Sequence, residues 1–311
     1  MCKTAHELIF LDGTLKPVSS APTWALLAGA AMWGVLWYPY RLLAHAGLDG
    51  IWSSLVTYGA ALVAGVAIFP RVAASLRNIP PAALVMGAAI GWSNLAYVTA
   101  VLEGEVMRVL LLFYLAPLWT VPIARVLLKE KATASGLAVM ALAFAGAMVM
   151  LWKPQIGLPW PQARAEWLGL AAGFLFALGN VLVRRLEDMG DAAKSMVIWA
   201  GVTLASAAHL PWSSSAAPDA LRASLDHWPL VAGIAAVLVT MSLALQYGLS
   251  RMPANRAIVI LLFELVVAAI AAWLLAGETM RPQDWIGGAL IVAATLASEL
   301  SLSPGRGPGR G

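Results

Sequence analysis

Cysteine is nearly absent from this sequence, in which Cys2 is the only cysteine among 311 residues. One thiol cannot form a disulfide within its own chain, and it cannot build a thiolate metal site. Histidine is also rare, and the four histidines lie in or near connectors instead of pairing within a helix: His6, His45, His209 and His227. We therefore expect neither a metal site nor a cofactor.

Charged residues are scarce as well, at 12% of the chain, whereas 61% of the residues are hydrophobic and the mean hydropathy is +0.80. An ordinary soluble domain carries about a quarter charged residues. The composition excludes such a domain and predicts that most of the chain lies in a bilayer. The net charge of +4 comes from basic residues dispersed among loop ends, so it does not indicate a nucleic-acid partner.

Common catalytic motifs are missing too. The sequence contains no HExxH zinc motif, no Walker-type glycine loop and no GxSxG nucleophile motif. We therefore expect that the protein is not an enzyme and that ATP does not drive it through this chain alone.

One stretch of the chain occurs twice. Residues 108–130 begin with Arg108 and end with Glu130, and residues 256–278 begin with Arg256 and end with Glu278. Both pairs are separated by 148 residues, which favours an internal duplication over a chance likeness of two apolar runs. A helix of this length rises about 33 Å, enough to cross the roughly 30 Å hydrocarbon core of a bilayer. Each copy is therefore predicted to span the membrane.

Apolar runs bounded by charge, proline or glycine predict ten spans. They lie near residues 22–45, 51–69, 80–102, 106–128, 132–151, 165–187, 193–210, 228–250, 253–276 and 282–301. Because five spans is an odd number, the second copy begins on the opposite side of the membrane. The expected fold is an all-α integral membrane protein, with ten transmembrane helices in two inverted five-helix repeats around a central cavity.

This interpretation divides the chain into an N-terminal arm, a first repeat, a connector, a second repeat and a tail, at 1–21, 22–151, 152–164, 165–302 and 303–311. The apolar piece in the arm, Leu8–Leu11, is too short for a signal-peptide core, so we expect the arm to be retained. Fourteen of the 20 Lys and Arg residues fall on the side of the termini. By the positive-inside rule, both termini are predicted to be cytoplasmic.

The paired arrangement resembles the EamA-domain branch of the drug/metabolite transporter superfamily. The resemblance rests on two segments, LFYLAPLWTVPIARVLLKEKATASG in the first half and ILLFELVVAAIAAWLLAGETMRPQDWIGG in the second. The similarity covers about residues 22–302. The segment GWSNLAY and the abundance of tryptophan are also similar to bacterial aromatic amino-acid exporters of the YddG type. The resemblance implies a ten-helix basket, a central cavity and outward movement of amino acids or related metabolites.

Three prolines lie inside predicted spans: Pro39, Pro117 and Pro122. Each removes a backbone donor and disfavours straight helix, so these residues either let helices splay around a cavity or only set packing geometry. The second copy carries Leu265 where the first carries Pro117, so the prolines do not predict the same kink in both copies.

Charged residues at span ends are assigned mainly structural roles. Arg108 either snorkels to the headgroups or pairs with Glu103 or Glu105 in a gate region. Glu130 is expected to pair with a nearby base such as Lys129.

Glu264 is the only carboxylate near the middle of a predicted span. Because burying its charge is costly, it should be protonated, paired or in contact with a wet cavity. It could carry a proton during transport or bind a substrate's ammonium group. The alternative is a neutral Glu hydrogen-bonded to a neighbouring helix.

Polar and aromatic residues away from the span ends form a candidate substrate-binding set. Trp33 and Trp37 are four residues apart, as are Ser93 and Tyr97, so each pair shares a helical face. Apolar walls with a few convergent polar groups are typical of small-molecule cavities. Each aromatic taken singly could equally pack against a helix or face lipid. The full set is Trp33, Trp37, Ser93, Asn94, Tyr97, Tyr114, Trp119, Asn180, Gln246, Tyr247 and Glu264.

The leading hypothesis is a secondary transporter that exports amino acids, aromatic ones included, or related metabolites by alternating access. Its partners would be a small-molecule substrate and the lipid bilayer of a bacterial inner membrane, and it would function as a monomer. The alternatives are a transporter of other drugs or metabolites, a facilitator channel, and a membrane scaffold or signalling protein.

Overall fold

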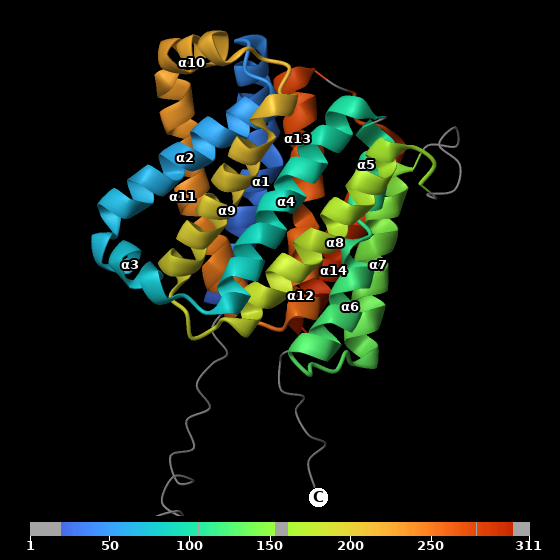
Figure 1. The fold of residues 1–311 in the computed structure, drawn as a ribbon. Helices are drawn as coiled ribbons and strands as arrows, with labels where there is room; N and C mark the ends of the chain where they lie inside the picture. Colours follow the sequence, from blue (N-terminus) through green and yellow to red (C-terminus); the bar gives the residue numbers. More distant parts are fainter. Residues whose placement is uncertain (1–19, 105, 153–160, 278, 301–311) are drawn as a thin grey trace, which may run out of the picture.

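The structure is a computed structural model that describes residues 20–104, 106–152, 161–277 and 279–300 (Figure 1). Residues 102, 106–108, 276 and 298–300 are described by their backbone only. Most of the N-terminal arm, all of the tail and much of the connector lie outside the described residues.

The regular structure of the described residues is helical, as the composition predicts. Proline occupies one of the first two positions of several helices, where its missing N–H has no helical partner to lose. The α-helices are α1 (Ala21–His45), α2 (Gly50–Ile68), α3 (Pro70–Ser75), α4 (Pro81–Glu103), α5 (Val106–Phe113), α6 (Ala116–Leu127), α7 (Ala134–Leu151), α8 (Arg164–Arg185), α9 (Asp191–His209), α10 (Ala217–Asp226), α11 (Trp228–Ser250), α12 (Ala254–Leu261), α13 (Phe263–Ala276) and α14 (Pro282–Leu300).

Seven helical stretches within the described residues are long and apolar enough to cross a membrane. They are Gly50–Ile68, Pro81–Val101, Val109–Leu127, Ala134–Leu151, Arg164–Arg185, Trp228–Ser250 and Ala254–Leu275. The protein is therefore an all-α, multi-pass membrane protein. The other three predicted spans correspond to α1, α9 and α14, in which proline, aromatic or charged residues lower the mean hydropathy.

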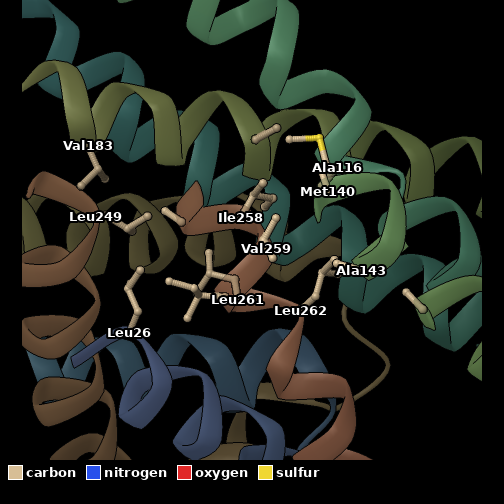
Figure 2. Close-up of a cluster of buried hydrophobic side chains, with 14 of the residues drawn as sticks. Leu26, Ala116, Met140, Ala143, Val183, Leu249, Ile258, Val259, Leu261 and Leu262 are labelled. Atoms are coloured by element: carbon tan, nitrogen blue, oxygen red, sulfur yellow. The ribbon is translucent and has the colours of Figure 1, made fainter. Parts of the chain in front are cut away.

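From Ala257 on, α12 is apolar on every side, and its polar residues Asn255 and Arg256 lie in its first turn. Every residue from Ala257 to Leu262 is buried. Figure 2 shows Ile258, Val259, Leu261 and Leu262 surrounded by side chains from the first half, including Leu26 of α1, and from α8 and α11. A helix that is hydrophobic all round is one enclosed by protein or lipid. Here it is enclosed by protein, so residues from both halves share one core.

Helices of the first half pack mainly on helices of the second. α4 packs on α8 and α9, α1 packs on α11 and α13, α2 packs on α9 and α11, α6 packs on α8, and α7 packs on α14. The short helices α3 and α10 lie at opposite ends of the bundle (Figure 1).

Glycine allows the closest of these crossings. A Cβ on Gly91 of α4 would lie 2.4 Å from the carbonyl oxygen of Gly201 on α9, and a Cβ on Gly173 would lie 2.4 Å from that of Phe113. A Cβ on Gly287 of α14 would lie 2.4 Å from the carbonyl oxygen of Gly146 on α7. At these points the helices meet backbone to backbone, as the small residues at membrane-helix interfaces permit.

The two copies of the duplicated stretch are not the single helices that the sequence analysis predicts. The first is interrupted between α5 and α6, and the second at Leu262, between α12 and α13. At both junctions a backbone N–H bonds three residues back instead of four, from Leu118 to Leu115 and from Leu265 to Leu262. Both copies are therefore interrupted at corresponding places, although Leu265 of the second copy stands where the first has Pro117.

Asp49 connects two loops at the end of the bundle where α10 lies. It caps α2 by accepting a hydrogen bond from the backbone N–H of Trp52 at 2.9 Å. Its other oxygen accepts bonds from the Ser213 hydroxyl and from the backbone N–H groups of Ser214 and Ser215. Burial alone would raise the pKa of the Asp49 carboxyl, but these bonds lower it overall below its ordinary value of 3.8.

We expect Asp49→Ala to lower the stability of the purified protein by about 1 kcal/mol or more, because a helix cap and the contact with the serine loop are lost together. Asp49→Asn keeps much of the capping geometry but cannot carry the charge. A depressed carboxyl pKa contributes stability above the unfolded pKa and loses it as the pH falls through the folded value. The thermal unfolding temperature of the wild type should therefore exceed that of Asp49→Asn near neutral pH. The difference should shrink as the pH falls below the ordinary pKa and vanish only below the lower pKa of the folded state. A difference that is independent of pH would contradict the role of the charge.

Candidate functional site

A cavity of about 110 Å³ lies in the interior of the bundle. It is bounded by helices of both halves, and its lining combines apolar, aromatic and polar side chains. The lining residues are Ala30, Trp33, Tyr58, Ile90, Ser93, Asn94, Tyr97, Phe113, Tyr114, Phe176, Asn180, Ile198, Met241, Ser242, Leu245, Gln246, Leu249, Leu261 and Glu264. The volume is smaller than the roughly 300–1,000 Å³ of drug-sized ligand sites. In this conformation the cavity suits waters or a small solute, and a larger solute would require it to widen.

The structure brings together eight of the eleven residues of the predicted binding set. The eight in the lining are Trp33, Ser93, Asn94, Tyr97, Tyr114, Asn180, Gln246 and Glu264. Trp37, Trp119 and Tyr247 are not part of it. Trp37 makes an edge contact with Tyr38, Trp119 makes one with Phe174, and the Tyr247 ring lies under the guanidinium of Arg251.

Aromatic rings form one wall of the cavity around Phe113. Its ring centroid lies 5.1 Å from that of Tyr97, 5.3 Å from that of Tyr114 and 5.4 Å from that of Phe176. The sequence analysis did not identify Phe113, Phe176, Tyr58 or Ser242. The sequence around an aromatic residue in an apolar span does not indicate whether its ring faces protein or lipid. For Phe113 alone, the neighbouring Tyr114 in the duplicated stretch could have indicated a place near the cavity.

Glu264 lies in the first turn of α13, directly after the interruption of the second copy. Glu264 is 7% exposed, and the Tyr114 hydroxyl donates a hydrogen bond to its Oε1. Tyr114 lies at the interruption of the first copy, so this bond joins the two broken spans. Within the described residues, no Lys or Arg lies within ion-pair distance of Glu264. A carboxyl in the first turn of a helix also faces the positive end of the helix dipole.

α1 approaches α13 closely beside this carboxyl. A Cβ on Gly34 would lie 2.6 Å from the backbone oxygen of Glu264 and 3.0 Å from the Cβ of Val267. The backbone of Glu264 is therefore held by direct helix contact, whereas its side chain faces the cavity.

The polar groups of the lining fall into two classes. The Ser93 hydroxyl donates to the backbone oxygen of Ala172 at 2.9 Å, and the Ser242 hydroxyl accepts from the Trp199 ring N–H at 2.9 Å. These hydroxyls already stabilise helix contacts. In contrast, the Nδ2 atoms of Asn94 and Asn180 and the Oε1 of Gln246 are buried and have no hydrogen-bond partner in the structure.

The gating and structural candidates are placed as follows. Pro39 and Pro122 lie inside α1 and α6, and both helices continue through them. Pro117 lies in the first turn of α6, immediately after the interruption. The side chain of Arg108 is outside the described residues, as is Glu105. Glu103 pairs with Arg164 at 3.8 Å.

Glu130 pairs with a base, as expected, but among the described residues that base is Arg184 and not Lys129, which corrects the sequence interpretation. Lys129 adopts a left-handed conformation with φ 58° directly after α6, where the chain turns. Glu130 accepts a hydrogen bond from the backbone N–H of Ala254 at 3.1 Å, so it caps α12. Its Oε1 also lies 3.6 Å from Nε of Arg184.

Lys194 is fully buried, and it shares Ser250 as a hydrogen-bond partner with Arg184. Its ammonium donates to the hydroxyl of Ser250 and lies 3.4 Å from a carboxylate oxygen of Asp191. Asp191 also pairs with Arg251 at 2.8 Å. These contacts connect the start of α9 to the end of α11. Within the described residues, no group of three or more His, Cys, Asp or Glu side chains could hold a metal ion.

Residues 163–298 match the model of the EamA-like transporter family. An uncharacterized transporter of Archaeoglobus fulgidus is 26% identical over 205 residues, which cover 65% of this chain and 70% of the relative. One protein of known crystal structure superposes with a TM-score of 0.70 at 17% identity, and the match covers 91% of this chain and 98% of the other. At this identity the structural likeness concerns the fold alone.

Proposed function

We infer that this chain is a secondary transporter, and not an enzyme, that moves small metabolites by alternating access. The match of residues 163–298 to the EamA-like transporter family and the likeness to an uncharacterized transporter support this inference. The observation that carries the proposal is the cavity. It lies within the bundle, it is lined from both halves, and it holds a buried carboxyl and unpartnered amide groups. Secondary transporters bind substrates at such sites, near the bilayer midplane between structural repeats.

We further propose ten transmembrane helices in two inverted repeats. In this arrangement α1, α2, α4 and α7 correspond to α8, α9, α11 and α14, and the two broken spans correspond to each other. The packing supports the proposal, because exchanging each helix for its counterpart converts the contacts of α4 with α8 and α9 into those of α11 with α1 and α2. The pairs α2–α9 and α7–α14 are converted into themselves. The interruptions at corresponding places in the duplicated stretch agree with this relation.

The proposed location is the plasma membrane, a bacterial inner membrane, with both termini in the cytoplasm. The distribution of Lys and Arg supports this topology. The loop that contains α3 would then be cytoplasmic and the loop that contains α10 would face outward.

The proposed substrates are amino acids, aromatic ones included, and the proposed direction is export. The ring cluster around Phe113 offers an apolar wall for a substrate side chain, and the Glu264 carboxyl offers a partner for an ammonium group. Glu264 would act either through this contact or by exchanging a proton during the cycle. A facilitator channel remains the second candidate within transport. A scaffold protein would need neither a polar cavity nor a carboxyl in its lining.

Reconstitution into proteoliposomes with a panel of radiolabelled amino acids tests the proposal, with aromatic ones measured first. We expect saturable uptake that unlabelled substrate on the opposite side accelerates, because a carrier returns faster when loaded. Uptake without such acceleration would favour the facilitator channel. The absence of uptake for every amino acid tested, in vesicles that contain folded protein, would contradict amino-acid transport.

A further inference from the structure

Three amide side chains in the cavity present unsatisfied hydrogen-bonding atoms. Asn94 comes from α4, Asn180 from α8 and Gln246 from α11. Asn180 is 8% exposed and Gln246 is 4% exposed. Two of the atoms are donors, the Nδ2 groups of Asn94 and Asn180, and one is an acceptor, Oε1 of Gln246. Their convergence on one cavity sets them apart from Ser93 and Ser242, whose hydroxyls hold helices together.

Buried polar atoms in folded proteins nearly always have partners, because an unsatisfied one destabilises the fold. A site that keeps such atoms facing a cavity gains when a ligand supplies the missing bonds. The same site rejects analogues that lack the matching group, since the polar atoms are then buried unpaired. The unpartnered amides therefore describe the chemistry of the missing ligand.

That ligand must offer one group that accepts hydrogen bonds and another that donates them. The two Nδ2 groups match an acceptor with several lone pairs, such as a carboxylate. The Gln246 oxygen and the Glu264 carboxyl match a donor with several N–H bonds, such as an ammonium. No Lys or Arg contributes to the described lining, and an ionised Glu264 would repel anions, so a ligand of net negative charge fits poorly.

We propose that Asn94 and Asn180 bind the carboxylate of a zwitterionic substrate, and that Gln246 and Glu264 bind its ammonium. This inference rests on the proposed transport of amino acids and deepens it by assigning each end of the substrate. The rings around Phe113 then take the side chain. Recognition of the carboxylate comes from neutral amides, so the substrate is selected for carrying both groups and not for its charge.

Competition against uptake of labelled phenylalanine in proteoliposomes tests the assignment. Phenethylamine lacks the carboxylate, and 3-phenylpropionate lacks the ammonium. The wild type should bind each analogue at least about tenfold more weakly than phenylalanine, as expected for the loss of hydrogen bonds to a charged group. Asn180→Leu replaces the amide with a side chain of similar volume. This variant should bind phenylalanine about tenfold more weakly than the wild type does, and its binding of phenethylamine should be unchanged. Gln246→Leu should instead reduce the discrimination against 3-phenylpropionate, and the part that remains should come from Glu264.

Asn255→Leu is the matched control. Its Oδ1 is also buried without a partner, but Asn255 is not part of the cavity lining. We expect this variant to bind phenylalanine, phenethylamine and 3-phenylpropionate with the same order of affinities as the wild type. If Asn180→Leu does not yield folded protein, Asn94→Leu provides the same comparison on the other donor.

The outcomes separate the two proposals. If phenylalanine is transported but phenethylamine competes equally well, or if the Asn94 and Asn180 variants retain the full discrimination, the assignment is overturned while amino-acid transport stands. If phenylalanine is neither bound nor transported by folded wild-type protein, the proposed aromatic substrate and the assignment fall together.

Discussion

Replacing Glu264 with glutamine is expected to lower the transport rate about tenfold or more, or to remove its dependence on pH. The substitution keeps the size of the side chain and a possible bond with Tyr114, but it removes the negative charge and the capacity to take up a proton. A hydrogen bond to a charged group contributes about 1.5–3 kcal/mol, which corresponds to about one to two powers of ten in affinity. Initial rates in proteoliposomes, measured across a pH series, provide the test.

Glu166→Gln is the control for this change. Glu166 is as buried as Glu264, at 7% exposed, but it lies at the start of α8 and accepts a bond from the backbone N–H of Gln162 at 2.7 Å. It does not line the cavity, so transport by this variant should retain its rate and pH profile. Tyr114→Phe removes only the bond to Glu264 and should alter transport less than Glu264→Gln. An unchanged rate together with an unchanged pH profile in Glu264→Gln would exclude Glu264 from the mechanism.

Introducing leucine at Gly91 is expected to prevent α4 and α9 from packing. Even the first atom of the new side chain would lie 2.4 Å from the carbonyl oxygen of Gly201, and backbone cannot move aside as a flexible side chain can. Overpacking costs about 1–3 kcal/mol in cores that can adjust, and more where they cannot. We expect little monodisperse protein in size-exclusion chromatography after extraction in mild detergent, and a lower unfolding temperature for whatever remains.

Gly233→Leu makes the same substitution on α11. A Cβ at Gly233 meets no atom within 4 Å. Leucine favours helix more than glycine and suits a lipid-facing surface, so this variant should be extracted with a wild-type profile. Equal behaviour of the two variants would mean that the α4–α9 crossing tolerates a wider separation than the structure has.

The sequence predicts much of the architecture because membrane spans depend on long-range averages of hydropathy. The eight lining residues could be predicted from their positions along the spans, since a polar group at mid-span must face protein or water. The break at Leu262 could not be predicted, because no proline or glycine marks it in the sequence. The partners of Glu130 could not be predicted either, since Ala254 and Arg184 come from distant parts of the chain.

The enclosure of α12 has a consequence for biogenesis. A segment surrounded by protein on all sides cannot reach its final place until the helices around it have been synthesised and inserted, and α1, α6 and α7 precede it by more than a hundred residues. The interior is thus completed late, near the end of translation. Nascent chains that stall before residue 254 would present an unfilled centre to the membrane and should be preferred targets of quality-control proteases.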